Sequence, residues 1–154
     1  MTQEERQLLF QDLSARLPYG VKILYESWNY ELDQELSLLE RVVGIDDNFV
    51  YTKVIDRKTG EEYRDNKHPI DTFDGRPYLR PLSNMTEKEE DEFFDYYHRI
   101  EFAELQKSGN SLKAAYLGDN AKYEWLNAHH FDYRYIIDKC LAIIVTETNN
   151  PYKK

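Results

Sequence analysis

Hydrophobic residues near the start of the chain predict an amphipathic helix over residues 2–17. A leucine recurs at every fourth position from Leu9 to Leu17, which places these side chains on one face of a helix. Thr2 and Glu5 have the spacing of a capping box, in which each side chain bonds the backbone N–H of the other residue. A proline follows the last leucine, and because the residue before a proline avoids helical angles, the helix should end there.

Short runs rich in β-forming residues predict strands between residues 21 and 65. The run VKILYES (21–27) alternates loosely between apolar and polar positions, and NFVYTKVID (48–56) alternates clearly. The run ELSLLERVVGI (35–45) fits a strand or a helix, and its Val-Val-Gly-Ile end favours the strand. With a hairpin turn around Gly60, these runs indicate an antiparallel meander, bent or closed around the first helix. A small SH3-like barrel is one version of this arrangement.

The middle of the chain combines a proline-rich segment with an acidic helix start. We expect residues 66–85 to be irregular, because each proline there removes a backbone donor. Within them, PYLRPL is predicted to be an edge strand or a short extended crossing segment. Thr86 and Glu89 form a second capping box, which opens a helix predicted over 87–107. The carboxylates that fill its first turns suit the partial positive charge at the amino end of a helix.

The last third of the chain is predicted to be mainly helical. We expect a broken helical region over 111–129, interrupted at Gly118-Asp119, and a short helix from Asp132 to about Leu141. The run AIIVT then fits a final strand, and the tail is expected to be loose from about residue 149. These patterns predict an α+β fold in a single domain over 1–154, with an N-terminal helix, a small bent antiparallel sheet and C-terminal helices.

Charge narrows the classes of partner. The 154 residues carry a net charge of -9, with a pI of about 4.9. Direct nucleic-acid binding is disfavoured, because it usually needs a basic face. The acidity fits a protein that docks on a basic partner, or one that imitates nucleic acid with the carboxylates of residues 87–95, although solubility is the simpler interpretation.

Membrane and disulfide signals are weak. No apolar run approaches the ~18 residues of a membrane span. The N-terminus has no apolar signal core, and a single cysteine cannot form an internal disulfide. We therefore expect a cytoplasmic protein without membrane contact. Cys140 follows Ile136 and Ile137 on an apolar face, so we expect a buried core residue and not a nucleophile.

One cluster of polar and aromatic residues, NAHHFDYR, is a candidate catalytic site. His129 or His130 could act as a general base oriented by Asp132, in a small enzyme that acts on a nucleotide or phosphoester. The alternative is structural: Asp132 serves as a helix N-cap, and the segment is a helix–turn–helix corner. In that corner we expect Phe131 to be buried and His130 to be partly exposed.

A second group, Asp95, His98 and Glu101, has a spacing of three residues along the predicted acidic helix. Three such side chains could share one face as metal ligands, but a surface ion pair explains them more simply. We therefore predict no metal site and no cofactor.

Three stretches, LSARLPYGVK (13–22), RPYLRPLSNMTEKE (76–89) and EWLNAHHFDYR (124–134), occur in this order along the chain. Together they resemble a large set of small uncharacterised proteins encoded by phages, prophages and mobile elements of gut Bacteroides-type bacteria. The resemblance implies a phage or mobile-element context and supplies no activity. In that set a glycine is usual near the position of Cys140, and the C-terminal end is shorter and richer in glycine.

The leading functional hypothesis is a non-enzymatic interaction or regulatory protein that binds a protein partner. It would use an aromatic, acidic surface, because no catalytic motif stands out and the chain holds 13 tyrosines. The candidate contact residues are Tyr78, Leu79 and Arg80, with Tyr96 nearby. A structural role for Tyr78 and Leu79, as a tether of this segment to the core, is the competing interpretation.

Overall fold

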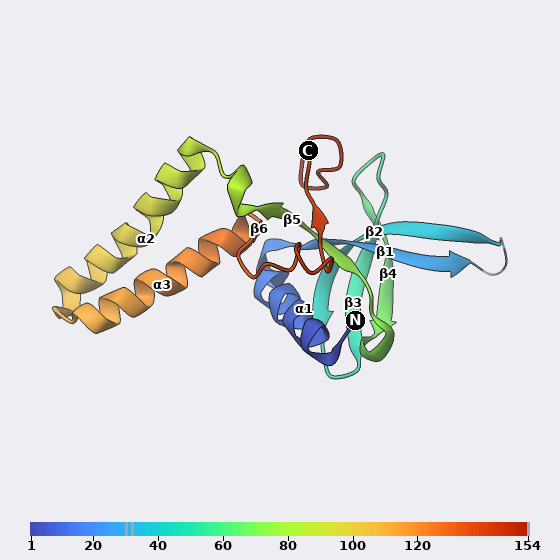
Figure 1. Ribbon diagram of the computed structural model, residues 1–154, viewed down its shortest axis with the longest axis horizontal. Helices are drawn as coiled ribbons and strands as arrows, with labels where there is room; N and C mark the ends of the chain where they lie inside the picture. Colours follow the sequence, from blue (N-terminus) through green and yellow to red (C-terminus); the bar gives the residue numbers. More distant parts are fainter. Residues whose placement is uncertain (30, 32, 154) are drawn as a thin grey trace.

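The structure, a computed structural model, describes residues 1–29, 31 and 33–153. It has two parts, a body in which a helix packs on a sheet and a helical hairpin that extends away from it (Figure 1). Along the chain the elements are α1 (Gln3–Arg16), β1 (Lys22–Asn29), β2 (Gln34–Ile45), β3 (Phe49–Ile55), β4 (Glu62–Pro69), β5 (Arg76–Pro81), α2 (Glu87–Ser108), α3 (Ser111–Ala128), β6 (Phe131–Asp132) and β7 (Ile143–Ile144). The predicted α+β fold is confirmed.

Helix α1 forms where its leucines predict it. The capping box between Thr2 and Glu5 is present at its amino end, and Leu9 and Leu13 are fully buried against the sheet. A single 3-10 turn follows at the proline, and Gly20 then adopts a left-handed conformation that redirects the chain into β1. This packing makes the main core of the body.

The sheet has the order β4-β3-β2-β1-β5-β6, and β7 pairs with β5 beside this path. The first four strands form the predicted antiparallel meander. β6 and β7 are parallel to β5, so the complete sheet is mixed. It does not close into an SH3-like barrel, because β4 and β6 remain at opposite ends of the strand order.

The proline-bracketed segment β5 changes neighbours along its length. It pairs with β1 at Arg76 and Pro77, with β7 at Tyr78 and Leu79, and with β6 at its carboxyl end. The predicted crossing segment is therefore present, but it lies inside the sheet and not at an edge. Its prolines, which cannot donate to a ladder, lie in stretches where the pairing with β1 and with β6 is only two residues long.

The two long helices pack as an antiparallel hairpin. α2 and its capping box agree with the prediction, and α3 runs without a break through Gly118. The predicted interruption is wrong, because this glycine serves close packing: a Cβ at Gly118 would lie 3.3 Å from the Cβ of Glu101 on α2. Gly109 ends α2 in the left-handed conformation and starts the turn into α3.

The predicted final helix is wrong, since the described chain forms no helix between Asp132 and Cys140 and makes only a hydrogen-bonded turn there. The Asp132 carboxylate accepts hydrogen bonds from the backbone N–H groups of Ile136 and Ile137, at 3.1 and 2.8 Å. The turn ends with Cys140 N bonded to Ile137 O and Leu141 N bonded to Ile136 O, the pair of bonds that defines a Schellman motif. Cys140 is exposed, so the prediction of a buried core residue is also wrong.

The C-terminal segment returns to the sheet as predicted, through β7. Beyond it, Tyr152 holds the tail to the body: its hydroxyl donates to Tyr78 O at 3.0 Å and accepts from Lys22 N at 3.1 Å. Within the described residues, none of the helices is both long and apolar enough to span a bilayer.

Candidate functional site

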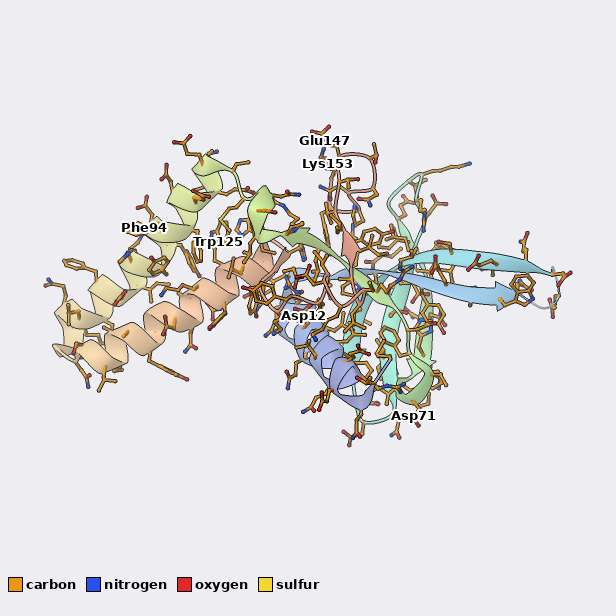
Figure 2. All side chains as sticks on the ribbon, in the orientation of Figure 1. Asp12, Asp71, Phe94, Trp125, Glu147 and Lys153 are labelled. Atoms are coloured by element: carbon orange, nitrogen blue, oxygen red, sulfur yellow. The ribbon has the colours of Figure 1, made fainter. Side chains whose placement is uncertain are left out.

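The corner between α3 and β6 joins the hairpin to the body. Phe131 is fully buried, and its ring stacks on Trp125 with centroids 5.9 Å apart. Leu126 completes this cluster, and the guanidinium of Arg80 lies 4.2 Å from the centre of the Phe131 ring. The expectation of a buried Phe131 is confirmed, and Figure 2 shows Trp125 between the two helices of the hairpin.

A buried ion pair fixes this corner to α1. The side chains of Asp12 and Arg16 are both fully buried, with two hydrogen bonds between them at 2.8 and 3.0 Å. Arg16 also donates to Phe131 O at 2.7 Å, and Arg134 donates to Asp12 at 3.0 Å. The Asp12 carboxylate on α1 thus binds both Arg16 and Arg134, and holds them beside the backbone of the corner.

A cavity of about 600 Å³ opens beside this corner, between β5, the end of α3 and the C-terminal tail. Its lining includes Arg80, which the sequence suggested as a contact residue, and His129 and His130, which it suggested as candidate general bases. The tail closes the other side with Tyr152 and Lys153. We take this cavity as the candidate ligand site.

His129 is oriented by the helix that carries it. Its Nδ1 lies 2.9 Å from the carbonyl oxygen of Trp125, so Nδ1 carries the proton and donates. The two rings stack with centroids 3.8 Å apart. This arrangement fixes the tautomer of His129 and leaves Nε2 as the nitrogen that can meet a ligand.

His130 is only 8% exposed, so the expectation of a partly exposed ring is wrong. Its ring stacks on Tyr152 at 3.8 Å, and its Nδ1 has no hydrogen-bond partner among the described residues. Burial lowers the pKa of His130 to about 3, and the nearby charge of Arg16 acts in the same direction. The ring is therefore neutral near pH 7 and is a weak general base there.

Asp132, the third member of the candidate catalytic group, does not line this cavity. Its two carboxylate oxygens bond the turn at Ile136 and Ile137, and its side chain contributes to a different surface hollow with Pro81 and Tyr135. The structure thus brings the two histidines together and leaves their proposed orienting acid elsewhere. The alternative interpretation is also wrong in its detail: among the described residues no helix follows Asp132, which lies in β6, so it caps a turn, and the corner joins α3 to a strand and not to a second helix.

The candidate contact residues occupy different environments. Tyr78 and Leu79 are buried in the sheet, so their side chains are not available at the surface. Arg80 forms a two-bond ion pair with Glu89, at 2.7 and 2.9 Å, and these bonds lower the pKa of Glu89 to about 2. Tyr96 is half-buried against the cluster around Trp125.

Sequence reasoning missed a buried polar group on the inner face of the sheet. Glu40 lies 2.6 Å from Nε2 of His68 and accepts a hydrogen bond from Thr52 at 2.7 Å. Burial acts to raise the pKa of Glu40, but hydrogen bonds from His68, Thr52 and Asn66 outweigh it and hold the pKa below its usual value. These residues come from three strands, so only the strand register places them together.

Potential metal ligands do not gather in the described part of the chain: it holds no group of three or more His, Cys, Asp or Glu side chains suited to a metal ion. Of the spaced group on α2, His98 and Glu101 lie 3.8 Å apart as an exposed pair. The geometry there is that of a surface ion pair.

The outer surface of the hairpin carries large apolar side chains. On α3, Leu112 is 84% exposed and Tyr116 is 66% exposed; on α2, Phe102 is 62% exposed and Phe94 is 54% exposed. Phe94 points outward from α2 in Figure 2. Single exposed apolar residues are ordinary on protein surfaces, but this group is concentrated on one projecting element.

Comparisons with protein-family models, with curated proteins and with solved structures give no match to this chain.

Proposed function

We propose that this protein is a non-enzymatic interaction protein of phage or mobile-element origin that binds a basic protein partner through the α2–α3 hairpin. The observation that carries the proposal is the exposure of large apolar side chains on a hairpin that extends from the body (Figure 1). Exposed apolar surface rimmed by polar groups is typical of protein interaction sites. The proposed aromatic, acidic binding surface therefore lies on the hairpin and not on β5, where the sequence suggested it.

Charge supports a basic partner. α2 contains eight carboxylate residues against three Lys or Arg residues. Carboxylates in its first turns stabilise the helix, and those that remain unpaired give the surface a negative potential. A basic partner would meet complementary charge around an apolar centre, which is the usual arrangement of a specific interface. A second copy of this chain would bring two acidic helices together.

The spacing of the exposed apolar residues on the hairpin suits a partner that offers a groove or a helix. Leu112 and Tyr116 are four residues apart on α3, which places them one turn apart on the same face. Phe94 contacts His98 on α2, with ring centroids 4.0 Å apart. Aromatic anchors of this kind supply most of the binding energy in many interfaces.

The test uses a hairpin variant and a matched control. The double substitution Leu112→Gln and Tyr116→Gln removes the α3 anchors, and Tyr63→Gln removes an equally exposed tyrosine from β4. Neither change should alter the free energy of unfolding by more than ~0.5 kcal/mol, because these side chains lie on the surface. A partner enriched from phage-bearing cells is then purified, and its affinity for the wild type and both variants is measured by titration calorimetry.

The proposal expects the hairpin variant to lose about tenfold or more in affinity, while the Tyr63→Gln control binds as the wild type does. The association rate should fall as salt increases, because opposite charges steer the encounter. Equal binding by both variants would contradict the proposed surface. Light scattering that shows a dimer lost only in the hairpin variant would identify a second copy as the occupant and overturn the basic partner.

A further inference from the structure

The cavity beside the Phe131 corner differs in charge from the protein around it. The chain as a whole is strongly acidic, with a net charge of -9. The described residues that line the cavity include Lys153, two histidines and Arg80, which is paired with Glu89, while the lining itself holds one carboxylate, Glu147. Glu147 and Lys153 both lie on the C-terminal tail, where Figure 2 labels them next to each other.

Two further cations stand behind the lining. Arg16 donates to the carbonyl of Phe131, the residue next to His130. The Nζ of Lys22 bonds Pro151 O at 2.7 Å and lies 5.7 Å from the centre of the Tyr152 ring, which stacks on His130. The positive charge near His130 therefore comes from α1 and β1 as well as from the lining.

The lining also offers hydrogen-bonding groups that the fold leaves unused. The Nδ1 of His130 is buried without a partner among the described residues, which is uncommon for a ring nitrogen. The Oδ1 of Asn150, another lining residue, accepts from Tyr152 N, and its amide nitrogen is a further donor. The lining also includes the amide of Asn84. Donors and cations gathered around one space are what an anion requires.

We propose that this cavity binds the oxyanion group of a small ligand, a phosphate or a carboxylate, between His129, His130 and Lys153, with a proton taken up at Nε2 of His129 so that this nitrogen donates to the ligand. Arg80 contributes shape more than charge, because both of its terminal nitrogens bond Glu89, whose carboxylate offsets the guanidinium. The bound oxyanion accepts a hydrogen bond from the imidazole of His130 and offsets the burial, and the neighbouring positive charges, that lower its pKa. This inference is independent of the hairpin, since its residues come from β5, the end of α3 and the tail.

The direct test follows the imidazole nitrogens of the intact ¹⁵N-labelled protein by NMR while sodium phosphate or sodium acetate is added. Sodium chloride at matched ionic strength is the reference titration. The proposal expects saturable shifts of the His129 and His130 signals with at least one of the two oxyanions, beyond those in chloride. A response to phosphate alone identifies a phosphate site, and a response to acetate identifies a carboxylate site. No shift beyond the chloride reference overturns the proposal.

A pair of charge variants checks the location. Lys153→Gln removes a cation from the lining, and Lys139→Gln removes the same charge from an exposed position beside α1. Lys153→Gln should lower the affinity for the oxyanion by about threefold, and Lys139→Gln should leave that affinity unchanged. Equal weakening in both variants would show that net charge, and not this cavity, attracts the ion, and would also overturn the proposal.

Discussion

Replacing Cys140 with glycine should stabilise the protein. Cys140 occupies the C′ position of the Schellman motif with φ of 58°, in the left-handed region. That conformation brings the Cβ of an L-residue close to the following carbonyl, whereas glycine has no Cβ. The thiol is exposed, so its removal empties no space in the core.

The magnitude follows from two opposing contributions. A side chain in the left-handed conformation costs about 1–2 kcal/mol. Glycine loses more backbone freedom on folding, which costs about 0.5–1 kcal/mol. The net gain in the free energy of unfolding is therefore about 0.5–1 kcal/mol, which corresponds to an increase in Tm of about 1–4 °C for a chain of this size.

Thermal denaturation followed by circular dichroism measures this change, with two controls. Lys139→Gly places a glycine one residue earlier, at an exposed position without a positive φ, and should lower the Tm. Gly109→Ala puts a side chain at φ of 64°, where nothing lies within 4 Å, and should also lower it. If Cys140→Gly left the Tm unchanged or lowered it, the side chain of Cys140 would not strain the left-handed backbone at this turn, and the reasoning would be refuted.

Three further predictions concern the core and the ion pairs. Phe131→Ala should lower the free energy of unfolding by about 3–5 kcal/mol in urea denaturation, because the ring is fully buried; a loss under 1 kcal/mol would contradict its place in the cluster. Gly75→Ala should cost about 1–3 kcal/mol, because the new Cβ would lie 2.5 Å from Phe73; an unchanged midpoint would show that the loop yields. Glu89→Gln should destabilise at pH 7 and progressively less as the pH falls from about 5 to about 2. The reason is that the pKa of Glu89, about 2 in the folded state, lies below its ordinary value, so the stability from the Arg80 pair is present above the ordinary pKa and lost in acid. A pH-independent difference between Glu89→Gln and the wild type would exclude that account.

Local spacing predicted the parts of the fold that local interactions determine. Both capping boxes, the start of α2 and the burial of Phe131 follow from residues within a few positions of one another. β2 was recognised as a strand from the β-branched residues at its end. In each case a few neighbouring residues are enough to predict the element, because the interactions that form it are local.

The errors arose where a distant segment decides the outcome. Gly118 looked like a helix break, but the close approach of Glu101 on α2 gives it a packing role. His130 looked exposed at a helix end, and Tyr152 from the tail covers it. Glu40 and His68 meet only through the register of the antiparallel strands, and nothing in the spacing of 28 residues between them indicates this.

The candidate ligand cavity was partly accessible to sequence reasoning. The sequence singled out the two histidines as candidate catalytic residues and Arg80 as a candidate contact residue, and all three line this cavity. Lys153 and the tail were not associated with them, because a C-terminal segment without regular structure gives no sequence signal of where it docks. The hydroxyl of Tyr152 makes that connection, through bonds to two strands.

The attachment of the hairpin at one end has a consequence for evolution and design. α2 and α3 meet the body near Phe93, Trp125 and Phe131, while the turn at Gly109 contacts nothing within 4 Å of its Cβ position. Adding or deleting about seven residues in each helix, two turns, would therefore keep the facing side chains aligned and leave the sheet untouched. The reach of this arm is a length that insertions and deletions can adjust without any change to the body that carries it.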